Sequence, residues 1–190
     1  HLNVQIAGPV AHLSDALALV DSLVPLAQSA PLPVWFETHR GRLTNDLLFT
    51  LRLLEARPDL PLTGDLSHYP VAGEMELPLR ADQLAAIERI LRNCRNFHGR
   101  ISTTHQVQVT FDAPQHHAWR DQHRAWWRRG FELWLERAGS DDALTFMCEL
   151  GPPPYAITAP DGSELGNRWE EAQRMRNMVR ALWRDVNGAP

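Results

Sequence analysis

The sequence predicts an α/β fold built on a parallel sheet. Short apolar runs alternate with longer amphipathic stretches five times along the 190 residues. Each run is brief and nearly continuous, as in strands that are covered on both faces. No internal repeat, linker or low-complexity segment divides the chain, so we expect a single domain over residues 1–190. The alternation leaves two architectures open, a doubly wound open sheet and part of a β/α barrel.

Strands are predicted at the five apolar runs, which cover His1–Ile6, Pro33–Glu37, Leu60–Asp65, Asn96–Ile101 and Leu144–Glu149. Helices are predicted at the amphipathic stretches, which cover Ser14–Ala27, Thr44–Ala56, Ala81–Asn93, Gln115–Arg137 and Arg168–Val186. Ser14-Asp15 and Asn45-Asp46 are of the residue types that cap helix starts, and we assign them that role. The tryptophans of the fourth helix recur at helical spacing and are predicted to pack in the core.

The composition excludes several kinds of chemistry. All 19 basic residues are Arg, so mechanisms that need a side-chain amine are excluded, including Schiff-base formation and the phosphate-binding loop with its Lys. The net charge of −4 argues against a nucleic-acid binder. No run approaches the about 20 apolar residues of a membrane span. Two cysteines, Cys94 and Cys148, form no disulfide framework, and we expect a cytoplasmic protein.

Four consecutive predicted strands end in a side chain that can bind a metal. These side chains are Glu37, Asp65, His98 and Glu149. The carboxyl ends of parallel strands lie at the edge where α/β proteins place their active sites. Three carboxylates gathered there repel one another unless a cation lies among them. Two Glu, one Asp and one His suit one divalent ion, namely Mn²⁺, Mg²⁺, Co²⁺ or Zn²⁺.

The chain resembles the xylose-isomerase-like barrels, a family of sugar phosphate isomerases and epimerases that is also related to AP endonucleases. The matching pieces are Phe36-Glu-Thr-His39, Asp65-Leu-Ser-His68, His98-Gly-Arg100 and Glu149-Leu-Gly-Pro-Pro-Pro-Tyr155. Further matches are Gln106-Val107 and the pair Trp126-Trp127. The resemblance covers nearly the whole chain, and its most specific part is Glu149–Tyr155.

The resemblance implies a TIM-type β/α barrel in which Glu37, Asp65, His98 and Glu149 hold the metal. Their strands would be the fifth to the eighth, and His1–Ile6 would be the fourth. We therefore expect the first three strand–helix units to be absent and the N-terminus to be incomplete. The alternative is a natural half-barrel that covers its open edges by pairing, which would make the protein a homo-oligomer.

The chemistry implied by the family is isomerisation or epimerisation of a sugar through an enediolate. A divalent ion polarises the carbonyl, while two carboxylates exchange the proton on the neighbouring carbon. Glu37 and Glu149 receive these catalytic roles in addition to binding the metal. His68 is one helical turn from Asp65, and Arg100 shares a strand face with His98, so both are candidates for contact with substrate. Tyr155, in a rigid loop after three prolines, is a third candidate.

Two other functions fit the same residues. A dehydratase or lyase uses the same metal site, because an enediolate can also expel a leaving group. A truncated barrel that binds a sugar or a partner without turnover is the alternative outside enzymology. An endonuclease would need further His ligands and a basic groove, and the negative net charge disfavours it. The leading hypothesis is a metal-dependent isomerase or epimerase of carbohydrate metabolism.

Overall fold

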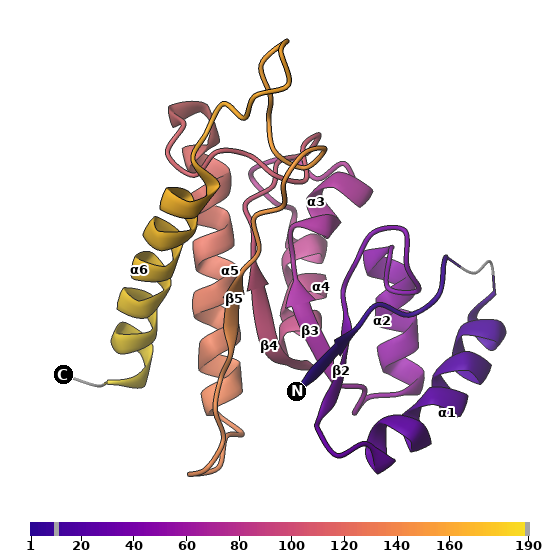
Figure 1. Ribbon diagram of the computed structural model, residues 1–190. Coiled ribbons are helices and arrows are strands. Elements are labelled where there is room, and N and C mark those ends of the chain that lie inside the picture. Colours follow the sequence, from indigo (N-terminus) through magenta and orange to yellow (C-terminus); the bar gives the residue numbers. More distant parts are fainter. Residues whose placement is uncertain (10–11, 189–190) are drawn as a thin grey trace.

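The computed structural model describes residues 1–9 and 12–188, which form a curled parallel sheet with helices on its outer face (Figure 1). The strands are β1 (Leu2–Val4), β2 (Val34–Glu37), β3 (Leu62–Asp65), β4 (Cys94–Gly99) and β5 (Phe146–Cys148). Each overlaps its predicted run. All are parallel and lie side by side in chain order.

The helices are α1 (Leu13–Ser29), α2 (Leu47–Ala56), α3 (His68–Ala72), α4 (Ala81–Leu91), α5 (His117–Leu135) and α6 (Arg168–Asn187). All but the short α3 were predicted, and a 3₁₀ turn at Pro114–His116 precedes α5. Asp46 caps α2, since its carboxylate accepts a hydrogen bond from the Phe49 N–H at 2.7 Å. The predicted capping role of Ser14 and Asp15 is wrong, because α1 begins at Leu13 and both residues lie inside its first turn.

The sheet topology distinguishes between the two predicted architectures. A doubly wound sheet reverses its strand order partway and carries helices on both faces. Here the order never reverses, and the successive helices α1, α2, α4, α5 and α6 pack side by side around the convex face (Figure 1). The protein is therefore an α/β half-barrel. No helix in the described ranges combines the length and apolar character needed to cross a membrane.

The hydrophobic core lies between the convex face of the sheet and the helices. Phe36, Leu62 and Phe97 supply the sheet side of this core, and Trp127 and Phe131 of α5 pack against it. The predicted core role of the α5 tryptophans is confirmed. Helix α5 approaches β4 closely because Gly130 has no side chain, and a Cβ atom there would lie 2.5 Å from the Phe97 ring.

The concave face of the sheet is polar. The prediction of strands that are apolar on both faces is therefore wrong for this face. Successive side chains of a strand point to opposite faces, so each apolar residue of the core alternates with a polar residue of the concave face. The residues whose side chains lie on the concave face include Asn3, Glu37, Thr63, Asp65, Asn96 and His98. Trp35 shares this face, where it stacks on His1 with ring centroids 4.2 Å apart. The concave face therefore presents hydrogen-bonding and titratable groups.

Candidate metal centre

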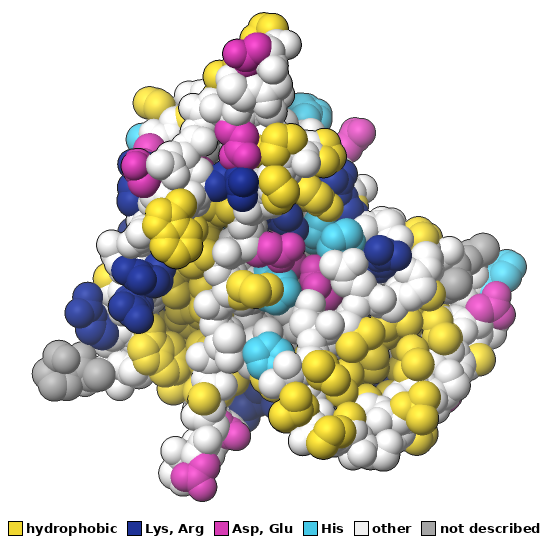
Figure 2. Space-filling model, viewed as in Figure 1, with side chains coloured by type: hydrophobic (Ala, Val, Ile, Leu, Met, Phe, Trp, Pro, Cys, Tyr) yellow, Lys and Arg dark blue, Asp and Glu magenta, His cyan; other side chains and the backbone are white. Residues whose placement is uncertain are grey.

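The four predicted ligands meet at the carboxyl edge of the sheet. Glu37 ends β2, Asp65 ends β3, His98 lies in β4 and Glu149 directly follows β5. One ligand atom from each lies within 4.8 Å of those of the other three. The Glu149 N–H donates to the Gly99 carbonyl at 2.9 Å, which extends the pairing of β5 with β4 as far as this carboxylate. Acidic, histidine and arginine side chains gather at the middle of this face (Figure 2).

The geometry of this cluster fits one divalent ion. Oxygen and nitrogen ligands about 2.0–2.2 Å from a common ion lie about 3–4.3 Å from one another. The Nδ1 of His98 is 2.8 Å from Oε2 of Glu149 and 3.9 Å from Oε2 of Glu37. Neither His98 Nδ1 nor Glu149 Oε2 makes an aligned hydrogen bond, although both atoms are buried. Buried polar atoms without an aligned partner, gathered around one point, are expected where a cation binds.

Glu37 is held in place by the neighbouring strand. Its side chain is only 2% exposed, and its carboxylate accepts a short hydrogen bond from the amide of Asn3. The Gln5 amide approaches both carboxylate oxygens at 3.3 and 3.4 Å. No role was predicted for Asn3 or Gln5. Their two-residue spacing in the predicted strand His1–Ile6, which places both on one face, was the signal available to find them.

Asp65 is fully buried, and the groups bonded to its carboxylate favour its charged form. The N–H and hydroxyl of Ser67 donate to its Oδ1 at 3.0 and 2.6 Å. Its Oδ2 accepts from Nη2 of Arg100 at 2.5 Å and lies 3.2 Å from Nε2 of His68. Arg100 is only 2% exposed and also donates to the Ser67 hydroxyl. Arg100, which was predicted to contact substrate, is thus bonded inside the protein to Asp65, one of the four predicted metal ligands.

The pKa shifts follow from this arrangement. Burial raises the pKa of Glu37, and the hydrogen bond from Asn3 only partly opposes this. Burial would also raise the pKa of Asp65, but the adjacent His68 and Arg100 outweigh it and hold that pKa far below its usual range. Burial disfavours the charged forms of both His98 and Glu149. Their mutual attraction outweighs it, so the pKa of His98 is raised and that of Glu149 lowered.

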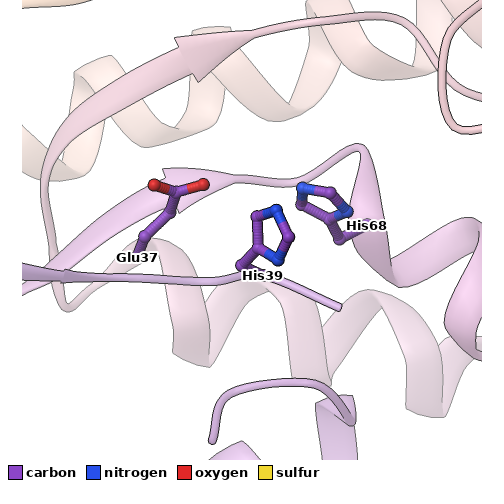
Figure 3. A group of neighbouring side chains, drawn as sticks. All are labelled: Glu37, His39 and His68. Carbon is purple, nitrogen blue, oxygen red and sulfur yellow. The ribbon is translucent and has the colours of Figure 1, made fainter. Parts of the chain in front are cut away.

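A second group of possible ligands adjoins the first. Figure 3 shows His39 between Glu37 and His68, and one ligand atom of each lies within 4.8 Å of the others. The two imidazole rings are 3.9 Å apart between centroids. Burial and the neighbouring His68 lower the pKa of His39 to about 4. Nη2 of Arg100 is 3.0 Å from Nε2 of His68, and this guanidinium disfavours a second cation there.

Tyr155 lies at the rim of the centre, as its predicted role requires. The Cζ of Arg100 is 5.0 Å from the centroid of its ring, and the Cζ of Arg40 is 5.9 Å from the same centroid. Tyr155, Arg40 and His39 line a cleft of about 540 Å³ beside the ligands. A separate cavity of about 660 Å³ lies at the opposite edge of the sheet, around the start of β2 and the end of α1. None of the four ligands lines either space, but the first is lined by His39, which lies next to Glu37.

The chain was compared with family models, curated proteins and solved structures, and none of them matches it. The family resemblance drawn from the motifs is therefore supported by no identified homologue.

Proposed function

We propose that this protein is a divalent-metal-dependent isomerase or epimerase of a small sugar or sugar-derived substrate. One observation carries the proposal. Four side chains of the metal-binding types, two Glu, one Asp and one His, come from four successive strands and converge within 4.8 Å. Structural carboxylates have no reason to gather in this way, since each buried neighbour of like charge costs free energy. One divalent ion is the implied cofactor.

We also propose that the half-barrel is part of a TIM-type barrel of the xylose-isomerase-like kind, without its first three strand–helix units. The uninterrupted parallel order and the curl of the sheet support this assignment. In this fold, active sites lie at the carboxyl ends of the strands, where the four ligands lie here. Strands β1 and β5 each have one neighbour in the described sheet, so a barrel closed by further strands or by a second copy would pair both edges.

The chain supplies the proton-transfer groups. The bound ion would polarise the substrate carbonyl and stabilise an enediolate, which is the usual contribution of a Lewis acid. Glu37 and Glu149 approach from β2 and from the end of β5, so they can face a substrate from two sides. One carboxylate takes the proton from the carbon beside the carbonyl, and the other returns a proton to the opposite face or to the adjacent carbon. Which of the two is the base depends on the sugar.

The remaining predicted residues position these groups. Arg100 holds Asp65 in its charged, metal-binding form, and its guanidinium is also 3.8 Å from Oε1 of Glu149. His68 is buried between Asp65 and His39, so it reaches a substrate beside the ligands only if one of these neighbours moves. Tyr155 lines the cleft beside His39 and Arg40. We propose that these three side chains orient the substrate against the ion.

Metal content tests the first part of the proposal. The purified chain, incubated with Mn²⁺ and dialysed, is expected to retain about one ion, because four side-chain ligands exceed the three protein ligands of a typical catalytic metal site. The double variant His98→Ala/Glu149→Ala should retain none. The control is His105→Ala/Glu136→Ala, which removes the same residue types from exposed positions and should bind like the wild type. A wild-type chain that retains no ion would contradict the proposal.

Proton transfer tests the second part. The Mn²⁺-loaded protein is incubated with a panel of ketoses and aldoses in D₂O, and NMR detects deuterium at the carbon beside the carbonyl. The variant Glu149→Gln should lose about 10²–10⁴-fold in kcat, as expected when a general acid or base is removed. Its metal content is measured in parallel. Unchanged turnover in this variant would exclude Glu149 from the reaction.

A further inference from the structure

Glu149 is the least enclosed of the four candidate ligands. Its side chain is 32% exposed, whereas the side chains of the other three are at most 3% exposed. It follows β5, which has one neighbour in the described sheet, and its N–H is bonded to the Gly99 carbonyl of that neighbour. Enclosure by surrounding side chains therefore fixes Glu149 less than it fixes the other ligands, and the backbone on either side of it matters more.

Gln108 binds the chain two residues beyond Glu149. Its amide NH₂ donates to the Gly151 carbonyl at 2.9 Å, and its Oε1 accepts from the Gly151 N–H at 2.8 Å. The side chain thus exchanges two hydrogen bonds with one residue, as the backbone of a neighbouring antiparallel strand would. Gln108 is buried, so breaking either bond would leave a polar group of this amide without its partner.

Gln108 is itself tied to the strand that contains His98. The N–H of the next residue, Val109, donates to the Ile101 carbonyl at 3.0 Å, so the loop after β4 returns to the end of that strand. Gln108 therefore links the carboxyl end of β4 to the carboxyl end of β5. Two candidate ligands lie at these ends, His98 and Glu149, and their Nδ1 and Oε2 atoms are 2.8 Å apart.

The residue that Gln108 holds also supports Tyr155. A Cβ atom on Gly151 would lie 3.0 Å from Cβ and Cδ2 of Tyr155, so the tyrosine packs directly on this glycine. The centroid of the tyrosine ring is in turn 5.0 Å from the Cζ of Arg100. One buried amide is therefore connected, through a single residue, to both a candidate ligand and a candidate substrate contact.

We infer that Gln108 is a positioning residue, which by holding Gly151 sets where Glu149 meets the ion and where Tyr155 faces the cleft. This inference rests on the proposed function for the roles of Glu149 and Tyr155. The hold of Gln108 on the backbone at Glu149 is measurable without ion or substrate. Residues that orient a metal ligand typically contribute about 10–100-fold to metal affinity.

The first test is a double-mutant cycle on Mn²⁺ affinity, measured by calorimetry. Gln108→Met removes both hydrogen bonds at similar volume and should weaken binding about 10–100-fold. In the Glu149→Ala background the same change should add almost nothing, because no ligand is left for Gln108 to position. A role in stability alone would weaken binding equally in both backgrounds.

Asn93→Leu is the matched control for this cycle. Asn93 is also a buried amide, and it donates to the backbone carbonyls of Pro58 and Leu60 at 2.7 and 3.0 Å. These bonds lie at the amino ends of the strands, away from the four ligands. The control loses the same kind of interaction and should bind Mn²⁺ like the wild type.

The second test measures amide hydrogen exchange by NMR on the metal-free chain. In Gln108→Met the N–H groups of Glu149 and Gly151 should exchange about tenfold faster than in the wild type, as expected when local hydrogen bonds are lost. The Phe97 N–H, which donates to the Thr145 carbonyl before β5, should exchange at the wild-type rate.

The two tests separate this inference from the proposed function. If the wild type binds no Mn²⁺ but exchange at Glu149 rises as expected, Gln108 positions this residue and the proposed metal site alone is contradicted. Unchanged exchange at Glu149, or an equal loss of Mn²⁺ affinity in both backgrounds, overturns the inference. If Gln108→Met does not fold, Gln108→Asn replaces it in both tests, because it keeps the amide on a shorter side chain and should show the same effects at smaller size.

Discussion

At the scale of single residues, the protein neutralises its buried charges in advance of any ion. Asp65 is fully buried, and Arg100 is almost so, yet the two are bonded to each other and to Ser67. An unpaired charge at this depth would cost several kcal/mol, whereas a paired and hydrogen-bonded charge costs far less. Asp65 is therefore fixed in its ionised form by the protein itself. The hydrogen bonds and the ion pair within the fold thus offset the free-energy cost of burying this carboxylate.

His123 gives a prediction at the same scale. Its Nε2 accepts a hydrogen bond from the Ser102 N–H at 3.2 Å, and the tryptophans of α5 surround its ring. Burial lowers its pKa to about 4, against about 6.5 in an unfolded chain. The unfolded state therefore takes up the proton first as the pH falls. This residue should remove about 2 kcal/mol of stability between about pH 7 and pH 5.

Urea unfolding at a series of pH values measures this effect. His123→Gln lacks the titrating group, so its free energy of unfolding should fall less steeply over the same interval. His105→Gln changes an exposed histidine and should retain the wild-type slope. Equal slopes for the wild type and His123→Gln would show that His123 does not account for the loss.

At the scale of elements, packing between α5 and β4 depends on one glycine. Alanine at position 130 would gain about 1 kcal/mol of helix propensity. Its Cβ would lie 2.5 Å from the Phe97 ring, which is buried between the sheet and α5. Overpacking of this kind usually costs about 1–3 kcal/mol. We therefore expect Gly130→Ala to lower the free energy of unfolding, against its helix propensity.

Thermal unfolding followed by circular dichroism tests this expectation. Gly139→Ala is the control, because a Cβ there meets its nearest atom at 3.6 Å, which is ordinary contact. Its midpoint should stay close to that of the wild type. If Gly130→Ala unfolds at a higher temperature than the wild type, Phe97 has room to move, and the close approach does not limit the packing.

The elements and the convergence of Glu37, Asp65, His98 and Glu149 at one edge of the sheet could be predicted from sequence because each signal is local. A brief apolar run that ends in a carboxylate, such as β2 with Glu37, shows both the strand and its functional end. Helix α3 was missed because five residues are too few to establish a period. The partners of Glu37 and Asp65 were missed for another reason. Asn3 reaches Glu37 from β1, and Arg100 reaches Asp65 from the residue after β4. Spacing along one strand shows which face a side chain shares, but not which residue of another strand it contacts.

At the scale of the whole molecule, the two faces of the half-barrel differ in how they are covered. Helices pack along the convex face, whereas no helix of the described residues packs on the concave face, where Met147 is 46% exposed. Strand β5 also borders an apolar groove lined by Phe146 and Trp183. The sheet is therefore stabilised from one side only. A ligand bound across the strands adds stability from the other side.

The ion should therefore stabilise the whole chain. Its ligands come from four adjacent strands, so binding requires all of them to be paired. At about 100 times its dissociation constant, Mn²⁺ should raise the free energy of unfolding by about 2.7 kcal/mol, and a chelator should reverse this. Scanning calorimetry with and without Mn²⁺ measures the shift. The variant His98→Ala/Glu149→Ala should show none, and an equal shift in both proteins would mean that the ion binds elsewhere.

The order of the four proposed ligands along the chain also determines when the proposed metal centre can form during synthesis. Glu37, Asp65 and His98 leave the ribosome well before Glu149, which has to await the long segment that contains α5. Domains begin to fold while the chain is still growing, at about 5–20 residues per second. The nascent sheet must therefore tolerate its acidic edge for several seconds without a complete set of ligands. Arg100 emerges just after His98 and is available to neutralise Asp65 throughout that interval.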